Sequence, residues 1–200
     1  MKKMKKGFMF LAIAMVFTAF SFTNIIVEVY TADVTMSEIN WKAYKVTGQH
    51  EGTVNLKDGA LEFTDGMLSG GSFSIEMASL GSTDLKGEWK GKLDGHLKSE
   101  DFFGVEKYPT ANFTVTKVSA KGTPGDYKIT GDLTIKETTK EIKFYAHIED
   151  VDDTRVATAD IKLDRSDYDV RYGSGSFFAG LGDKTIYDDF ELSVKLVSTK

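Results

Sequence analysis

The chain lacks cysteine altogether and has only three histidines, His50, His96 and His147, which are far apart in the sequence. Without Cys there is no disulfide and no cysteine-linked lipid anchor, so the fold depends on its hydrophobic core alone. The three His have neither Cys neighbours nor the spacing of metal ligands. Composition therefore predicts no metal site.

Motifs for nucleotide binding and nucleophilic catalysis are also absent. There is no G-x-x-x-x-G-K-[ST] and no G-x-G-x-x-G. Ser174 lies in YGSGS, which does not match G-x-S-x-G. The acidic residues at 149, 150, 152 and 153 lack the Gly and bidentate Glu of a calcium loop, which favours a solvated turn. We predict no cofactor and no enzyme, since a hydrolase or isomerase would need a buried polar constellation.

Proline is scarce, with two residues, whereas the 19 glycines are spread among many short segments. This pattern excludes a Pro-rich linker and suits the turns of an all-β chain. The chain is 41% hydrophobic and 12% aromatic, which is enough for the core of one domain.

The N-terminus has the pattern of an export signal. Lys2, Lys3, Lys5 and Lys6 precede an uncharged apolar stretch over residues 7–27. We predict a signal peptide within residues 1–32, cleaved somewhere between 19 and 32, and a domain over residues 33–200. That domain would be periplasmic or secreted, with no membrane span after cleavage. An uncleaved anchor is the alternative, because the stretch is long enough to cross a bilayer.

Removal of the four lysines changes the formal charge from −5 to −9, or to −8 if Glu28 is removed too. An acidic domain repels phosphate backbones, so nucleic acid is not expected as a partner. The sequence does not fix the oligomeric state and allows a homodimer.

Alternation of apolar and polar residues predicts a series of antiparallel strands. Turns are expected at Lys57-Asp58-Gly59, at Gly66 and around Pro124. About eight or nine such strands form either a sandwich or a closed barrel, and a small barrel of about eight strands can hold one small ligand. The expected strands cover residues 34–46, 50–56, 60–65, 72–77, 111–118, 127–135, 141–148, 155–164 and 188–198.

A short helical lid is predicted over residues 85–108. Its apolar residues recur every fourth position, which places them on one helical face, although three glycines weaken the helix. Ser99 can cap a second short turn, and Pro109 returns the chain to an extended conformation. The apolar residues of this face are Leu85, Trp89, Leu93 and Leu97.

Two long interruptions, residues 80–109 and 165–186, are rich in aromatic side chains. Loops of this length in a compact domain are usually functional. They either close the mouth of a ligand-binding barrel or plug the ends of a solid one. The aromatic residues are Trp89, Phe102, Phe103 and Tyr108 in the first loop, and Tyr168, Tyr172, Phe177 and Phe178 in the second.

Three stretches resemble the YceI-like family in order and spacing: HLKSEDFFGVEKYPTANF, GDLTIKETTKEIKF and LDRSDYDVRYGSGSFFAGLGDKTIYDDFEL. The resemblance runs from about Asn40 to Leu196. It implies a lipocalin-like antiparallel barrel of a periplasmic or secreted protein that binds polyisoprenoid lipids. The turn from Lys136 to Lys140 and the Trp41-Lys42 pair depart from the family pattern, with little expected consequence for binding.

We therefore expect a non-catalytic barrel that sequesters or carries a long-chain isoprenoid lipid. Arg165 or His96 would contact a polar head group; alternatively, Arg165 pairs with Asp164, Asp167 or Asp101. A competing hypothesis is a solid, stress-related barrel that acts through its surface and binds no lipid. The predicted ligand-binding residues are Phe113, Ile129, Leu133, Phe144, Ile161 and Phe190 of the tunnel, with Leu97, Arg165, Trp89, Phe102, Phe103, Tyr108, Tyr168, Phe177 and Phe178 at its mouth.

Overall fold

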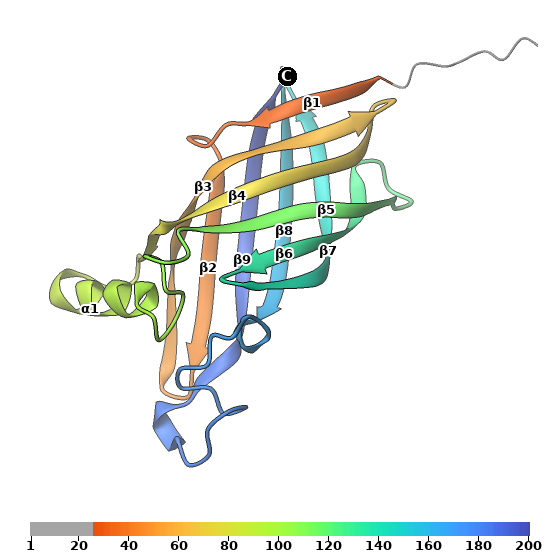
Figure 1. Cartoon of the computed structure of the whole chain (residues 1–200). Coiled ribbons are helices and arrows are strands. Elements are labelled where there is room, and N and C mark those ends of the chain that lie inside the picture. Colours follow the sequence, from red (N-terminus) through yellow and green to blue (C-terminus); the bar gives the residue numbers. More distant parts are fainter. Residues whose placement is uncertain (1–25) are drawn as a thin grey trace, which may run out of the picture.

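A computed structural model describes residues 26–200, which form one antiparallel sheet of nine strands and one α-helix, α1 (Gly87–Lys98) (Figure 1). Most of the predicted signal peptide lies outside the described residues. The strands are β1 (Val27–Ala32), β2 (Glu38–Lys45), β3 (Gly48–Thr64), β4 (Met67–Ser82), β5 (Thr110–Ala120), β6 (Asp126–Ile135), β7 (Thr138–Val151), β8 (Thr154–Asp164) and β9 (Ile186–Thr199).

The sheet closes on itself. Each strand from β4 to β9 pairs with the next along the chain, β9 pairs with β2, and β2 and β4 both pair with β3. Strands β2 to β9 thus form a complete ring of eight, which leaves no long open edge. The prediction of an all-β antiparallel barrel with one short helix is confirmed.

Strand β1 occupies the same slot in the ring as β2. Both strands pair with β3: β2 pairs with β3 residues 48–54, and β1 pairs with β3 residues 60–64. Both strands also pair with β9. A turn at Asp33 joins them, in which the Asp33 carboxylate accepts from the backbone N–H of Thr35 at 2.8 Å. The sheet therefore begins at Val27, ahead of the predicted domain boundary at residue 33.

The predicted turn at Lys57-Asp58-Gly59 is wrong, because β3 continues through it. The β3–β4 register shifts between Leu56 and Asp58, as at a β-bulge. A Cβ on Gly59 would lie 2.4 Å from the Phe73 ring, so this glycine permits close packing instead of a turn. The next turn does occur where predicted, at Asp65 and Gly66, which both have positive φ.

The two ends of the barrel differ. Tight turns at residues 65–66, 121–125 and 152–153 lie at one end, together with the C-terminus; we call this the turn end. The segments at residues 46–47, 83–109, 136–137 and 165–185 lie at the other, the loop end (Figure 1). Both aromatic interruptions of the sequence are thus brought to the same end of the barrel.

Polar contacts hold α1 against β4. The Asp94 carboxylate accepts from the Ser82 backbone N–H at 2.7 Å and from the Ser82 hydroxyl at 2.8 Å. Lys90 forms an ion pair with Asp94 at 2.7 Å. Burial alone would raise the pKa of Asp94, but the hydrogen bonds from Lys90 and Ser82 outweigh it and lower that pKa.

The prediction that Trp89 faces the interior is wrong, since its side chain is 69% exposed. Residues four apart in a helix differ by about 40° in direction, so Trp89 and Leu97 differ by about 80°. The face turned to the barrel instead carries Lys90, Asp94 and Leu97, which are half-buried. Ser99 also differs from expectation, because its hydroxyl donates to the His96 carbonyl at 2.7 Å and closes the end of α1.

Candidate ligand-binding cavity

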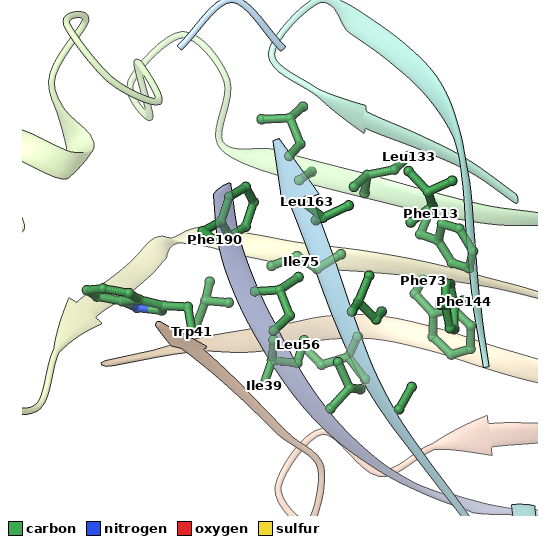
Figure 2. A pocket seen from close by; sticks show the side chains of 18 of the residues that line it. Ile39, Trp41, Leu56, Phe73, Ile75, Phe113, Leu133, Phe144, Leu163 and Phe190 are labelled. Carbon is green, nitrogen blue, oxygen red and sulfur yellow. The ribbon is translucent and has the colours of Figure 1, made fainter. Parts of the chain in front are cut away.

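The barrel encloses a cavity of about 260 Å³ whose wall is almost entirely apolar (Figure 2). Every strand of the ring contributes, because the residues that point inward alternate with those that point outward. Only a few polar residues reach the wall. Figure 2 shows, among others, Ile39, Trp41, Leu56, Phe73, Ile75, Phe113, Leu133, Phe144, Leu163 and Phe190 around this space.

Most of the predicted tunnel and mouth residues lie on this wall. Strand register explains why the tunnel residues meet: Phe113 is opposite Leu133, and Ile129 is opposite Phe144. A Cβ on Gly131 would lie 2.4 Å from the Phe113 ring, so the missing side chain makes room for that ring. The predicted residues on the wall are Leu97, Phe102, Phe103, Phe113, Ile129, Leu133, Phe144, Ile161, Arg165 and Phe190.

The other predicted residues lie off the wall. Tyr168 is 1% exposed and packs in the core beside the cavity. Tyr108 is half-buried, and its hydroxyl donates to the Glu137 carboxylate at 2.6 Å. Phe177 and Phe178 are exposed at the loop end, as Trp89 is on α1. The predicted positions of Trp89, Phe177 and Phe178 over the cavity are wrong, because the segments that carry these three side chains extend outward beyond the ring.

Sequence reasoning missed several wall residues that carry the same alternating signal. Ile39, Trp41 and Ala43 of β2 point inward, as do Ala157 and Ala159 of β8. The two alanines leave space that a larger side chain would fill. Period-two alternation within the predicted strands was sufficient to find them.

An aromatic cluster joins three segments at the loop end. The His96 ring of α1 lies 5.0 Å from the Phe102 ring and 4.4 Å from the Tyr172 ring, both edge to face, and Phe102 lies 5.7 Å from Tyr172. Such pairs contribute about 0.5–1.5 kcal/mol each beyond their buried area. We call His96, Phe102 and Tyr172 the clasp, since it links α1, the following turn and the β8–β9 loop.

Arg165 stands at the base of the β8–β9 loop and is 4% exposed. Its guanidinium donates to the carbonyls of Val170 (2.8 Å), Ile186 (3.1 Å) and Tyr187 (3.2 Å). It also pairs with Asp188 at 3.1 Å. Burial lowers the pKa of Arg165, with the nearby carboxylates opposing that shift.

The expected ion pair of Arg165 therefore exists with a different partner. Asp164 instead accepts from the backbone N–H of Ser166 at 2.8 Å, and Lys140 lies 3.8 Å from Asp167. Because most guanidinium donors already bind this chain, Arg165 has little capacity left for a head group.

Ser174 belongs to the same polar network. Its hydroxyl donates to Asp188 Oδ2 at 2.9 Å, and the Ser176 hydroxyl donates to the same oxygen at 2.6 Å. Ser174 is fully buried and fixes the loop. Of the other histidines, His50 contacts Asp84 at 2.8 Å and His147 contacts Asp126 at 2.6 Å.

Within residues 26–200, no cluster of three His, Asp or Glu side chains is placed to hold a metal ion. Over the same range, no helix combines the length and apolar character needed to cross a bilayer.

The geometry defines a class: a closed eight-stranded barrel around an apolar cavity. The YceI-like domain family matches residues 30–198, and the chain belongs to this family. A UPF0312 protein of Shewanella denitrificans is 34% identical over 96 residues, which are 48% of each chain. Protein YceI of Escherichia coli is 46% identical over 55 residues, 28% of each chain. The aligned part thus spans about half the length, or less, of these curated relatives.

Solved structures share the fold. BcnA of Burkholderia cenocepacia superimposes with a TM-score of 0.69 at 19% identity, covering 84% of this chain and 99% of that one. A polyisoprenoid binding domain from Saccharophagus degradans, implicated in plant cell wall breakdown, gives a TM-score of 0.61 at 14% identity, covering 85% and 97%. At these identities the likeness concerns the fold.

Proposed function

We propose that this barrel binds one long-chain polyisoprenoid lipid, of quinone or prenyl type, and sequesters or carries it. The observation that supports this most directly is the apolar wall, to which all eight strands of the ring contribute. Each buried CH₂ stabilises a bound chain by about 0.8 kcal/mol, so a prenyl tail needs no catalytic group to bind tightly. The Saccharophagus degradans neighbour, described as a polyisoprenoid binding domain, supports the same ligand class.

A polar head group would lie at the loop end. The clasp stands there, and its His96 ring is half-buried beside Phe102, which lines the cavity. Arg165 is less suited than predicted, because its donors bind backbone carbonyls and Asp188. His96 is therefore our preferred head-group contact.

We further propose that the protein is exported to the periplasm or beyond. The basic and apolar pattern of the first residues supports this. Cleavage ahead of Val27 would keep β1 in its slot between β3 and β9. Intact-mass measurement of the protein from its native host gives the mature N-terminus. A first residue beyond Val27 would contradict cleavage ahead of β1.

Lipid extraction tests the main proposal. Protein purified from its native host without detergent is extracted with organic solvent and the extract examined by mass spectrometry. We expect a long-chain isoprenoid in a ratio near one per protein. An extract without lipid, together with failure of the purified protein to take up an added prenol or isoprenoid quinone, would refute it.

A further inference from the structure

The β8–β9 loop carries three partly exposed aromatic side chains. Tyr172 is 47% exposed, Phe177 43% and Phe178 50%. We call Phe177 and Phe178, with the neighbouring Tyr172, the aromatic tip. Figure 1 shows this loop, in blue between the lighter β8 and the darker β9, extending past the strands at the loop end. Clustered exposed aromatics of this kind mark interaction sites.

The tip is held in position by its own hydrogen bonds. The backbone N–H groups of Phe177 and Phe178 donate to the Ser174 carbonyl at 3.3 and 3.0 Å, and Ser174 is anchored to Asp188. Below them, the N–H of Ile186 donates to the Gly173 carbonyl at 2.8 Å. The two rings are thus presented outward by an anchored turn, which suits a contact with something outside the molecule.

The tip is continuous with the loop-end part of the cavity wall. Arg165, Ile186 and Tyr187, at the base of the same loop, lie on the cavity wall. Tyr172 contacts His96 of α1 and Phe102, which also lines the cavity. A surface that contacts the tip is therefore adjacent to the loop-end part of the cavity.

Charge is distributed unevenly between this end and the rest of the domain. The loop-end segments, residues 46–47, 83–109, 136–137 and 165–185, carry nine basic and ten acidic side chains. Residues 26–200 together carry a formal charge of −9, so nearly all of that excess lies elsewhere. A surface rich in phosphate would repel the rest of the molecule and leave the loop end to approach it.

We propose that the aromatic tip docks on the surface of a phospholipid bilayer, so that the cavity opens against the lipid. Aromatic side chains favour the membrane interface, where their rings reach the boundary between head groups and acyl chains. Arg171, whose guanidinium lies 4.7 Å from the Phe177 ring centre, sits beside the tip. Its Nε already pairs with Asp169, so its terminal NH₂ groups would be the ones to contact the lipid phosphates. This role rests on the proposed lipid function for its purpose, but the docking can be measured independently.

Vesicle sedimentation with the full mature chain tests the docking. We expect wild-type protein to sediment with phosphatidylcholine vesicles. The Phe177→Ser/Phe178→Ser variant should bind these vesicles at least about tenfold more weakly, because two apolar rings are lost. Tyr145→Ser is the matched control: it removes a 61% exposed aromatic from the barrel wall on β7 and should leave vesicle binding unchanged. Equal binding by all three proteins, or none by wild type, overturns the proposal.

Uptake of a prenol from detergent separates this proposal from the proposed function. Phe177 and Phe178 are off the cavity wall, so the double variant should still take up prenol while its transfer to vesicles slows. Prenol uptake by a wild-type protein that never binds vesicles overturns the docking alone. Vesicle binding without any prenol uptake refutes the lipid-carrier function and leaves the docking supported. If light scattering shows a wild-type dimer, a monomeric double variant and no vesicle binding, the tip is a contact between copies and the proposal fails.

Discussion

Arg165 Nη2 lies 3.1 Å from Asp188 Oδ1, and both side chains are largely buried at the base of the β8–β9 loop. Asp188 also accepts from Ser174 and Ser176, so one carboxylate joins the end of β8, the loop and the start of β9. This ion pair fixes the aromatic tip relative to the barrel.

Replacement of Asp188 should therefore be costly. Asp188→Asn leaves the Arg165 guanidinium buried without a counter-charge, and we expect a loss of about 3 kcal/mol in the free energy of unfolding. Asp189→Asn is the control, since Asp189 pairs with Lys162 on the exposed surface and should change stability by about 0.5 kcal/mol or less. Urea unfolding of the two variants measures the difference, and equal losses would contradict the assigned role.

Filling the cavity should strongly weaken lipid uptake while the barrel remains folded. Ala159 points inward from β8 onto the cavity wall, so Ala159→Trp places an indole in the space that the ligand would occupy. We expect at least about tenfold weaker prenol uptake and a destabilisation of about 1–3 kcal/mol from overpacking. Asp160→Trp adds the same side chain to the outer face of the same strand and should bind normally. Comparable uptake by the two variants would show that the lipid binds elsewhere.

Two glycine substitutions should have opposite effects on stability. A Cβ on Gly131 would lie 2.4 Å from the Phe113 ring and 2.6 Å from the Thr114 carbonyl oxygen, so Gly131→Ala should destabilise by about 1–3 kcal/mol. Gly91 lies in α1 with nothing within 4 Å of its Cβ position, and Gly91→Ala should stabilise by up to about 1 kcal/mol. Thermal unfolding reports both changes, and a harmless Gly131→Ala would disprove the tight packing over Phe113.

The attachment of α1 should depend on pH. The lowered pKa of Asp94 means that its ionised form contributes stability above the unfolded-state value near 3.8, and that this contribution disappears as pH falls through the lower folded value. Asp94→Asn should thus cost about 1 kcal/mol at neutral pH, and the difference from wild type should shrink below about pH 4. Thermal unfolding between about pH 7 and pH 2 measures it, with Glu88→Gln on the exposed face of α1 as control. A difference that persists unchanged at the lowest pH would contradict the ionic attachment.

Much of the fold follows from local alternation, and the exceptions have physical causes. Strands β6 and β8 begin within one residue of the prediction, because each packs a single apolar face against the core. The break predicted at Gly59 was wrong, since glycine signals close packing as readily as a turn. Strand β1 was missed because its residues follow the apolar N-terminal stretch without a boundary signal.

In the candidate site, too, the strand residues could be predicted from the sequence and the loop residues could not. Phe113, Leu133 and Phe190 were found on the cavity wall because strand periodicity determines which way they point. No such periodicity exists in the loops, so nothing local distinguished Phe102, which faces the cavity, from Phe178, which faces the solvent. The Arg165–Asp188 pair could not be predicted from neighbouring residues either, because its two members are far apart in the sequence and only the pairing of β8 with β9 brings them together.

The separation of long loops and tight turns has a practical use. Because the C-terminus lies with the tight turns that follow β3 and β7 (Figure 1), an affinity tag, fluorophore or surface tether attached at Lys200 leaves the opposite end unobstructed. An immobilised sample built this way presents every barrel with its loop end outward. Attachment within residues 176–180 would cover the loop end instead, so the pair of tethers offers a direct comparison of barrels with an exposed and a covered loop end.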